Sequence, residues 1–167
     1  MFHRRPTPIA PGPGQESVWD YPRPAIAEPT AKRIEILFGG RALVDSRRAV
    51  RVLETSHPPS YYAPLEDADE SLLVPHPQRS LCEWKGQARY FSVRVGDRVA
   101  EAAAWTYPAP TPAFGILRDH LAVYPGRMDE CRVDGERVEP QPGGFYGGWI
   151  TRDVVGPFKG GPGTAGW

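Results

Sequence analysis

Cysteine is scarce in this chain, because Cys82 and Cys131 are the only two among 167 residues. Two cysteines are too few for a disulfide scaffold, and no Cys-x-x-Cys pair is present to begin a zinc site. We therefore expect reduced thiols, no metal ion and no cofactor. Cys131 alternates with the apolar Val133 and is predicted to lie in the core.

An excess of charge of one sign is also missing, since Lys plus Arg and Asp plus Glu both number 20. Proteins that bind nucleic acid or anionic membranes usually carry a basic excess. No stretch approaches the roughly 18 apolar residues of a membrane span, and the first residues lack the apolar segment of a signal peptide. These absences predict a cytoplasmic protein that binds neither nucleic acid nor membrane.

Proline and glycine are abundant, with 20 and 18 residues. Prolines spaced through residues 1–31 prevent a helix and favour an extended leader, whose first dozen residues are predicted to be disordered. Trp19 and Tyr21 are costly to leave in water, so this part of the leader is expected to lie as an arm on the body or on a second subunit of a homodimer. The body is predicted to span residues 32–155. The Gly/Pro-rich tail, residues 156–167, is expected either to wander or to be pinned by Phe158 and Trp167.

Short segments of alternating apolar and polar residues fill the predicted body. Three pairs of them are joined by two-residue turns of the kind that hairpins use, namely Gly39-Gly40, Gly96-Asp97 and Asp134-Gly135. No alternation of strands and helices indicates a parallel sheet. The sequence therefore predicts an all-β, mainly antiparallel fold with one or two short helices and extended arms at both ends.

Two segments are predicted to be helical, Pro64–Leu73 and a turn within Pro110–Leu117. In the first segment proline suits the first helical position, and the acids that follow match the helix dipole. Four acids so close together could suggest a metal site. Because no His or Cys joins them at ligand spacing, a solvated helix face is the better interpretation.

Candidate catalytic residues gather near two strand ends. Glu54 continues the apolar face of Val50 and Val52, so it must lie at a rim or pair with a buried donor. His57 lies in a stiff, proline-rich loop, where it is either a base or a surface histidine. Cys82 would be a nucleophile or redox centre only as a thiolate, and strand alternation turns Lys85 away from it, which favours a buried structural cysteine.

Aromatic residues are frequent near these same segments. A small-molecule pocket needs apolar walls with a few placed polar groups, and Lys85 could receive an anionic group there. An ordinary aromatic core is the alternative for the same rings. The predicted ligand-binding residues are Glu54, Thr55, Tyr61, Tyr62, Cys82, Trp84, Lys85, Trp105 and Tyr107.

Several motifs together resemble the bacterial domain-of-unknown-function 427 family. They are Arg51-x-Leu-Glu-Thr-Ser-x-Pro-Pro-x-Tyr-Tyr, Cys82-Glu-Trp-Lys-Gly, Ala104-Trp-Thr-Tyr-Pro, Asp119-His-Leu-Ala-x-Tyr and Phe145-Tyr-Gly-Gly-Trp-Ile-Thr. The leader Glu16-Ser-Val-Trp-Asp-Tyr-Pro and the tail Pro157-Phe-Lys-Gly-Gly-Pro-Gly resemble the longer, actinobacterial-type members. The resemblance covers roughly residues 16–167 and implies a β-tent-like body, in which two antiparallel sheets lean together at one edge.

Three kinds of function remain open at this stage. The preferred one is a module that binds a small ligand or a partner in an aromatic-lined cleft between the two sheets. The alternative is an enzyme that uses Cys82, with His57 or Glu54 as base, or the nucleotidyltransferase-like activity with which the family is sometimes labelled. That activity would need a metal-binding carboxylate pair in a Gly-Ser setting, and the chain has none. The third is an interaction protein whose arm around Trp19 docks on a twin subunit.

Overall fold

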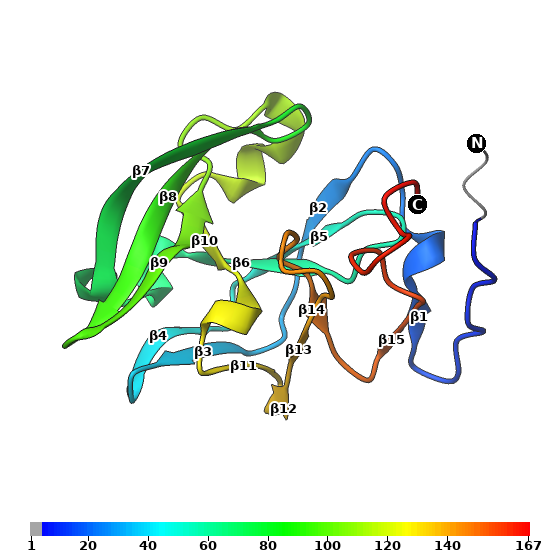
Figure 1. The fold of residues 1–167 in the computed structure, drawn as a ribbon, viewed down its shortest axis with the longest axis horizontal. Coiled ribbons are helices and arrows are strands. Elements are labelled where there is room, and N and C mark those ends of the chain that lie inside the picture. The colour runs from blue at the N-terminus through cyan, green and yellow to red at the C-terminus, as the bar shows by residue number, and fades with distance from the viewer. Residues whose placement is uncertain (1–4) are drawn as a thin grey trace.

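The computed structural model describes residues 5–167, and antiparallel strands dominate it (Figure 1). The larger sheet has seven strands in the order β2-β5-β6-β10-β9-β8-β7, which are β2 (Ile26–Pro29), β5 (Val50–Leu53), β6 (Ser60–Pro64), β10 (His120–Val123), β9 (Arg98–Thr106), β8 (Gly86–Val95) and β7 (Leu73–Cys82). The smaller sheet has four strands, β12 (Glu136–Arg137), β11 (Glu130–Val133), β3 (Ile34–Phe38) and β4 (Arg41–Ser46). The predicted all-β, mainly antiparallel fold is confirmed.

Two small strand pairs complete the fold. A parallel pair joins β1 (Glu16–Ser17) to β15 (Val154–Val155), and an antiparallel pair joins β13 (Glu139–Pro140) to β14 (Trp149–Ile150). Helical structure within residues 5–167 consists of short 3-10 helices, η1 (Val18–Asp20), η2 (Leu65–Asp67), η3 (Glu70–Leu72), η4 (Pro112–Leu117) and η5 (Pro125–Arg127). None of these is long and apolar enough to cross a membrane.

The three predicted hairpins are all present. β3 pairs with β4 across Gly39-Gly40, β8 with β9 across Gly96-Asp97, and β11 with β12 across Asp134-Gly135. Gly39, Gly40, Gly96 and Gly135 all have positive φ, and so does Asp134. These are the conformations that tight hairpin turns require, which is why the turn residues located the strands correctly.

The prediction of one helix over Pro64–Leu73 is wrong. The segment instead makes two separate 3-10 turns, η2 and η3, and Ala68 between them is extended. Asp69 is responsible, because its side chain accepts a hydrogen bond from the Ser71 backbone N–H while its own N–H bonds to the Leu43 carbonyl of β4. Such local bonds compete with a continuous helix.

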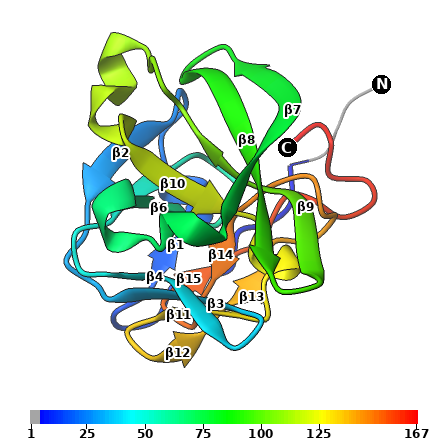
Figure 2. The same ribbon diagram turned by 90° about the vertical axis from the view of Figure 1, so that its left-hand side faces the viewer.

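The seven-stranded sheet buries side chains on both faces. In both views the smaller sheet lies along the lower side of the molecule, below β7–β10 (Figure 2). Between the sheets lies one core, to which β3 contributes Ile34 and Ile36, and β10 contributes Leu121 and Val123. The opposite face carries a second group, here called the cleft-side cluster, which consists of Ala25, Val50, Val52, Tyr62, Ala88, Tyr90, Trp105, Tyr107, Phe114, Leu117 and Ala122. No residue of the four-stranded sheet belongs to it.

The N-terminal arm lies on the body, as predicted. Trp19 and Tyr21 are each 7% exposed and pack with Leu53 and Val154. The Trp19 indole N–H donates to the Pro157 carbonyl at 2.9 Å, and its ring meets Trp167 at 5.7 Å between centroids. The tail is therefore pinned rather than wandering. Since the arm is covered by its own chain, its rings need no second subunit to shield them from water.

Disorder was predicted for the first dozen residues of the leader. Residues 1–4 of this stretch lie outside the described residues. From Arg5 onward the leader has a defined course, and the Ile9 backbone N–H donates to the Gly156 carbonyl at 2.8 Å. Prolines keep this stretch extended, and the C-terminal tail provides it with a surface.

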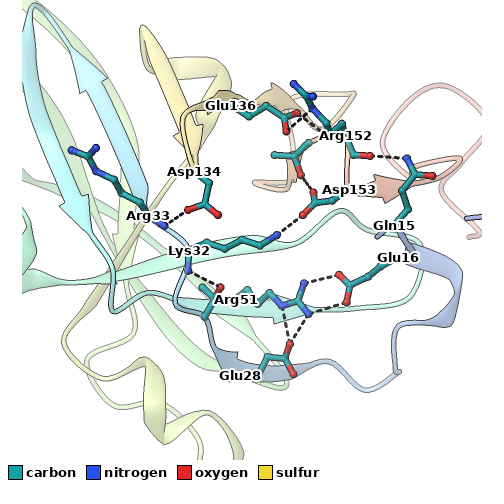
Figure 3. Close-up of polar contacts among 12 residues, drawn as sticks. Gln15, Glu16, Glu28, Lys32, Arg33, Arg51, Asp134, Glu136, Arg152 and Asp153 are labelled. Carbon is teal, nitrogen blue, oxygen red and sulfur yellow. Dashed lines mark hydrogen bonds and ion pairs between the residues drawn. The ribbon is translucent and has the colours of Figure 1, made fainter. Parts of the chain in front are cut away.

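A network of charged side chains fixes the arm to the sheet (Figure 3). Arg51 of β5 donates to both carboxylate oxygens of Glu16, at 2.6 and 3.0 Å, and also to Glu28 of β2 at 2.8 Å. Lys32 forms an ion pair with Asp153, while Gln15 donates to the Arg152 carbonyl. The network joins the arm, the edge of the large sheet and the segment before β15.

This network makes stability depend on pH. The hydrogen bond from Arg51 holds the pKa of Glu16 below its ordinary value of 4.5, against the opposing effect of burial. A carboxylate with a lowered folded-state pKa stabilises the fold above its unfolded pKa, and this stabilisation is lost as pH falls through the folded value. We expect Glu16→Gln to be less stable than wild type in urea unfolding at neutral pH, with a difference that shrinks below about pH 4. A difference that stayed constant across pH would contradict this role of Glu16.

Candidate functional site

A cavity of about 700 Å3 opens on the face of the large sheet that carries the cleft-side cluster. We call it the cleft. We expected it between the two sheets, and this position is wrong, because the space between the sheets is filled by the other core. The three stretches expected to meet in it, around residues 54–62, 82–85 and 105–107, do all contribute to its lining.

Aromatic rings form the wall of the cleft, with Trp105 at their centre. Its indole N–H donates to the Tyr62 hydroxyl at 3.3 Å, and its ring packs on Tyr124 with 4.6 Å between centroids. Tyr90 lies 6.4 Å from Trp105, and Tyr107 lies 6.2 Å from Tyr62. Burial raises the pKa of Tyr62, Tyr107 and Tyr124, so these phenols are neutral at physiological pH. The wall is therefore uncharged and held in place by packing and hydrogen bonds.

Side chains alternate between the two faces of a sheet along a strand, and this alternation explains which of Tyr61 and Tyr62 reaches the cleft. Tyr61 and Tyr62 are neighbours in β6, so their side chains leave opposite faces of the sheet. Tyr62 joins the cleft-side cluster, whereas Tyr61 packs between the sheets against Trp149. Thr55 also lies outside the lining, and its hydroxyl donates to the Tyr21 carbonyl of the arm. The predicted residues that do line the cleft are Glu54, His57, Tyr62, Cys82, Trp84, Lys85, Trp105 and Tyr107.

Lys85 carries a positive charge in the cleft. Burial alone would lower its pKa, but Tyr62, Cys82 and Glu54 outweigh burial and raise the pKa above 10.5. Its ammonium also lies 5.9 Å from the centre of the Phe114 ring. None of the ion pairs formed within residues 5–167 includes Lys85. The result is a half-buried cation that has no carboxylate partner there.

The expectation that Lys85 turns away from Cys82 is wrong. β7 ends at Cys82, and residues 83–85 form the turn into β8, so strand alternation no longer applies there. Lys85 and Cys82 both line the cleft, and the thiol is among the groups that raise the pKa of Lys85. Cys82 is half-buried at the cleft. By contrast Cys131 lies in the core, as predicted, and burial raises its pKa to about 12.

A tight turn over residues 54–57 brings Glu54 and His57 together. The His57 backbone N–H donates to the Glu54 carbonyl at 3.0 Å, and Ser56 between them has a φ of 74°. Such a φ is unfavourable for a residue with a side chain, and Ser56 is fully buried with its hydroxyl unpaired. The turn leaves His57 Nε2 3.4 Å from Glu54 Oε2.

His57 is buried rather than a surface residue, since only 9% of it is exposed. The Tyr146 ring meets its imidazole at 4.7 Å between centroids, edge to face. The Gln141 side-chain nitrogen lies 3.0 Å from His57 Nδ1 and also donates to the Lys159 carbonyl at 2.7 Å. The oxygen of the same side-chain amide, Gln141 Oε1, accepts a hydrogen bond from the Gly148 N–H at 3.1 Å.

Burial alone would raise the pKa of Glu54. The hydrogen bond and charge of His57, together with Lys85 and Arg23, outweigh burial and lower the pKa below 4.5. Glu54 is therefore ionised at neutral pH. Two positions were expected for Glu54, at a rim or beside a buried donor, and the structure has it in the cleft lining with the buried His57 as its neighbour.

Sequence reasoning missed the segment after residue 140, which supplies one side of the cleft. This side contains Gln141, Phe145, Tyr146, Gly147, Gly148 and Lys159. The backbone at Gly147 passes so close to Trp105 that an added Cβ would lie 2.6 Å from its ring. The run of glycines beside aromatic residues was the available signal, because glycine permits such a close approach.

Metal-binding side chains do not cluster here. Throughout the part of the chain that the structure describes, no group of three or more His, Cys, Asp or Glu residues could hold a metal ion. The carboxylates that line the cleft come from three separate places, Glu54 after β5, Glu83 in the turn between β7 and β8, and Glu101 in β9.

Comparison with known proteins identifies the family of this chain. A family model described as a domain of unknown function (DUF427) matches residues 26–134. No curated protein matches the chain.

Proposed function

The chain belongs to the DUF427 family, whose description assigns no activity, and from this premise we propose that it binds a small ligand in the cleft. The ligand carries a flat ring, which packs against the aromatic wall, and an anionic group, carboxylate or phosphate, which pairs with Lys85. The observation that carries this proposal is the charged, half-buried Lys85 ammonium without a carboxylate partner in residues 5–167.

A half-buried cation such as the Lys85 ammonium favours the binding of an anionic group. Partial burial removes water from the ammonium, and a charge that is left without a partner costs free energy. A carboxylate or phosphate from a ligand would replace the lost water with charge-assisted hydrogen bonds, which are about twice as strong as neutral ones. The aromatic wall supports the same ligand class, because rigid rings lose little freedom when a second ring packs against them.

The mouth of the cleft supports a ligand with apolar surface. Leu81, near the end of β7, is 79% exposed, and Phe145, in the segment after residue 140, is 76% exposed, although both belong to the cleft lining. Exposed large apolar side chains in a cavity lining suggest a binding surface, since a bound ligand would cover them.

The test is a calorimetric titration with indole-3-propionate, a two-ring carboxylate, and with AMP, a flat base with a phosphate. Lys85→Met keeps the aliphatic stem and removes the charge. We expect it to weaken whichever probe binds by about 10- to 150-fold, the effect of one charged hydrogen bond.

Lys159→Met is the matched control. Lys159 lines the same cleft, but its ammonium already donates to the Trp167 carbonyl at 3.3 Å. We expect its loss to weaken binding by less than about threefold, because its ammonium already has an acceptor in the tail and is held there. The proposal is wrong if neither probe binds, or if the two variants weaken binding equally.

A further inference from the structure

We infer that Glu54 is a second recognition group in the cleft, so that the ligand carries a cationic or N–H donor group beside its anionic group. His57 and Gln141 act as positioning residues that hold the Glu54 carboxylate. This inference rests on the proposed ring-and-anion ligand and adds to it the requirement for a donor.

The side-chain amide of Gln141 has only one orientation that satisfies its neighbours. A backbone N–H can only donate, so the atom of Gln141 that faces Gly148 must be the oxygen. A backbone carbonyl can only accept, so the atom that faces Lys159 must be the nitrogen. The amide nitrogen has a second hydrogen, and His57 Nδ1 lies 3.0 Å away.

This orientation decides where the imidazole carries its proton. Because the Gln141 nitrogen donates, His57 Nδ1 must accept, and the ring proton of neutral His57 is on Nε2. His57 Nε2, which then carries the proton, lies 3.4 Å from Glu54 Oε2. Both ring nitrogens of His57 therefore have a protein group as their neighbour.

In the series of contacts from Gln141 through His57 to Glu54, only the Glu54 carboxylate remains available to a ligand. Its Oε1 takes part in no hydrogen bond with any of residues 5–167, and the side chain lines the cleft with 24% of its surface exposed. The turn at Ser56 and the Gln141–His57 contacts hold the carboxylate without using up its second oxygen. A fixed, ionised acceptor at the edge of an aromatic cavity selects a ligand donor.

The opposite charges of Glu54 and Lys85 share one cavity, since both side chains line the cleft. No direct ion pair joins them within residues 5–167, although each affects the ionisation of the other. A ligand with an ammonium close to a carboxylate would satisfy both. The chemical class is therefore an aromatic zwitterion of the amino-acid type.

The experiment compares two probes that differ by one group. L-Tryptophan is indole-3-propionate with an added α-ammonium. We expect wild type to bind L-tryptophan about 10-fold more tightly than indole-3-propionate, and Glu54→Gln to bind both equally within about twofold. Glu101→Gln, which removes another carboxylate of the cleft lining, should keep the wild-type preference.

A spectroscopic measurement tests the positioning residues without any ligand. Imidazole 15N shifts in the full chain should show the proton of neutral His57 on Nε2. Gln141→Glu has almost the same shape but presents an acceptor to Nδ1 while Glu54 still faces Nε2, so it should place a proton on Nδ1 as well. If the proton of neutral His57 in the wild-type protein is found on Nδ1, the positioning role is wrong. This wild-type measurement does not depend on whether the variant folds.

The binding outcomes separate the two proposals. If indole-3-propionate binds through Lys85 but the α-ammonium adds no affinity, the role of Glu54 is wrong and the proposed function stands. If neither indole-3-propionate nor AMP binds, the proposed function itself is wrong.

Discussion

Trp149→Ala is expected to lower the free energy of unfolding by about 3–5 kcal/mol, the usual loss when a large buried aromatic residue is truncated. Trp149 in β14 is 1% exposed and fills the core between the two sheets. Its ring packs on Tyr61 with 5.1 Å between centroids, and its backbone N–H donates to the Pro59 carbonyl at 2.7 Å. Urea denaturation followed by far-UV circular dichroism would measure the change.

Phe145→Ala is the matched control for this truncation. It also removes a large aromatic side chain, but Phe145 is 76% exposed. We expect its free energy of unfolding to stay within about 0.5 kcal/mol of wild type. A loss of less than about 1 kcal/mol for Trp149→Ala would show that the segment after residue 140 is not part of the core.

The second large effect is expected from Gly160→Ala. An added Cβ would lie 1.9 Å from the Pro142 carbonyl oxygen, and the φ of 138° is one that alanine rarely adopts. The tail must move away to relieve this clash. It would then lose the backbone bond from Lys159 to Ser56, the bond from Gln141 to the Lys159 carbonyl and the bond from Gly160 to Thr164. Three such bonds correspond to roughly 2–4 kcal/mol.

Gly161→Ala, one position further along, is the control. Its Cβ would meet nothing within 4 Å, so we expect wild-type stability. Limited proteolysis should cut the tail of Gly160→Ala much faster than that of Gly161→Ala. Equal cleavage rates, together with equal urea midpoints, would contradict the close contact between residues 142 and 160.

Strands bounded by two-residue turns could be predicted from the sequence. Strands whose pairing depends on residues far away along the chain could not. Turn residues located three hairpins, because a two-residue turn sets the pairing of the strands beside it. β7 was missed because Pro75 and Pro77 interrupt its pattern. It lies at the edge of the large sheet, where a proline that cannot donate a ladder hydrogen bond is tolerated.

The candidate site shows the same division. Trp105 could be assigned to a pocket because it belongs to a strand with a clear period, and Glu54 because it directly follows another such strand. The partner that fixes His57 could not, since Gln141 lies 84 residues further along the chain. Nothing in the residues around either one predicts their contact, and only the path of the chain after β12 brings them together.

The match to the DUF427 model ends at residue 134, whereas Gln141, Tyr146 and Lys159 form one side of the cleft. The matched region thus contains the aromatic rings around Trp105 and the cation of Lys85, but not the segment that forms this side of the cleft. A similarity restricted to residues 26–134 would therefore not by itself define the shape of the site, because that shape also depends on the residues after 140.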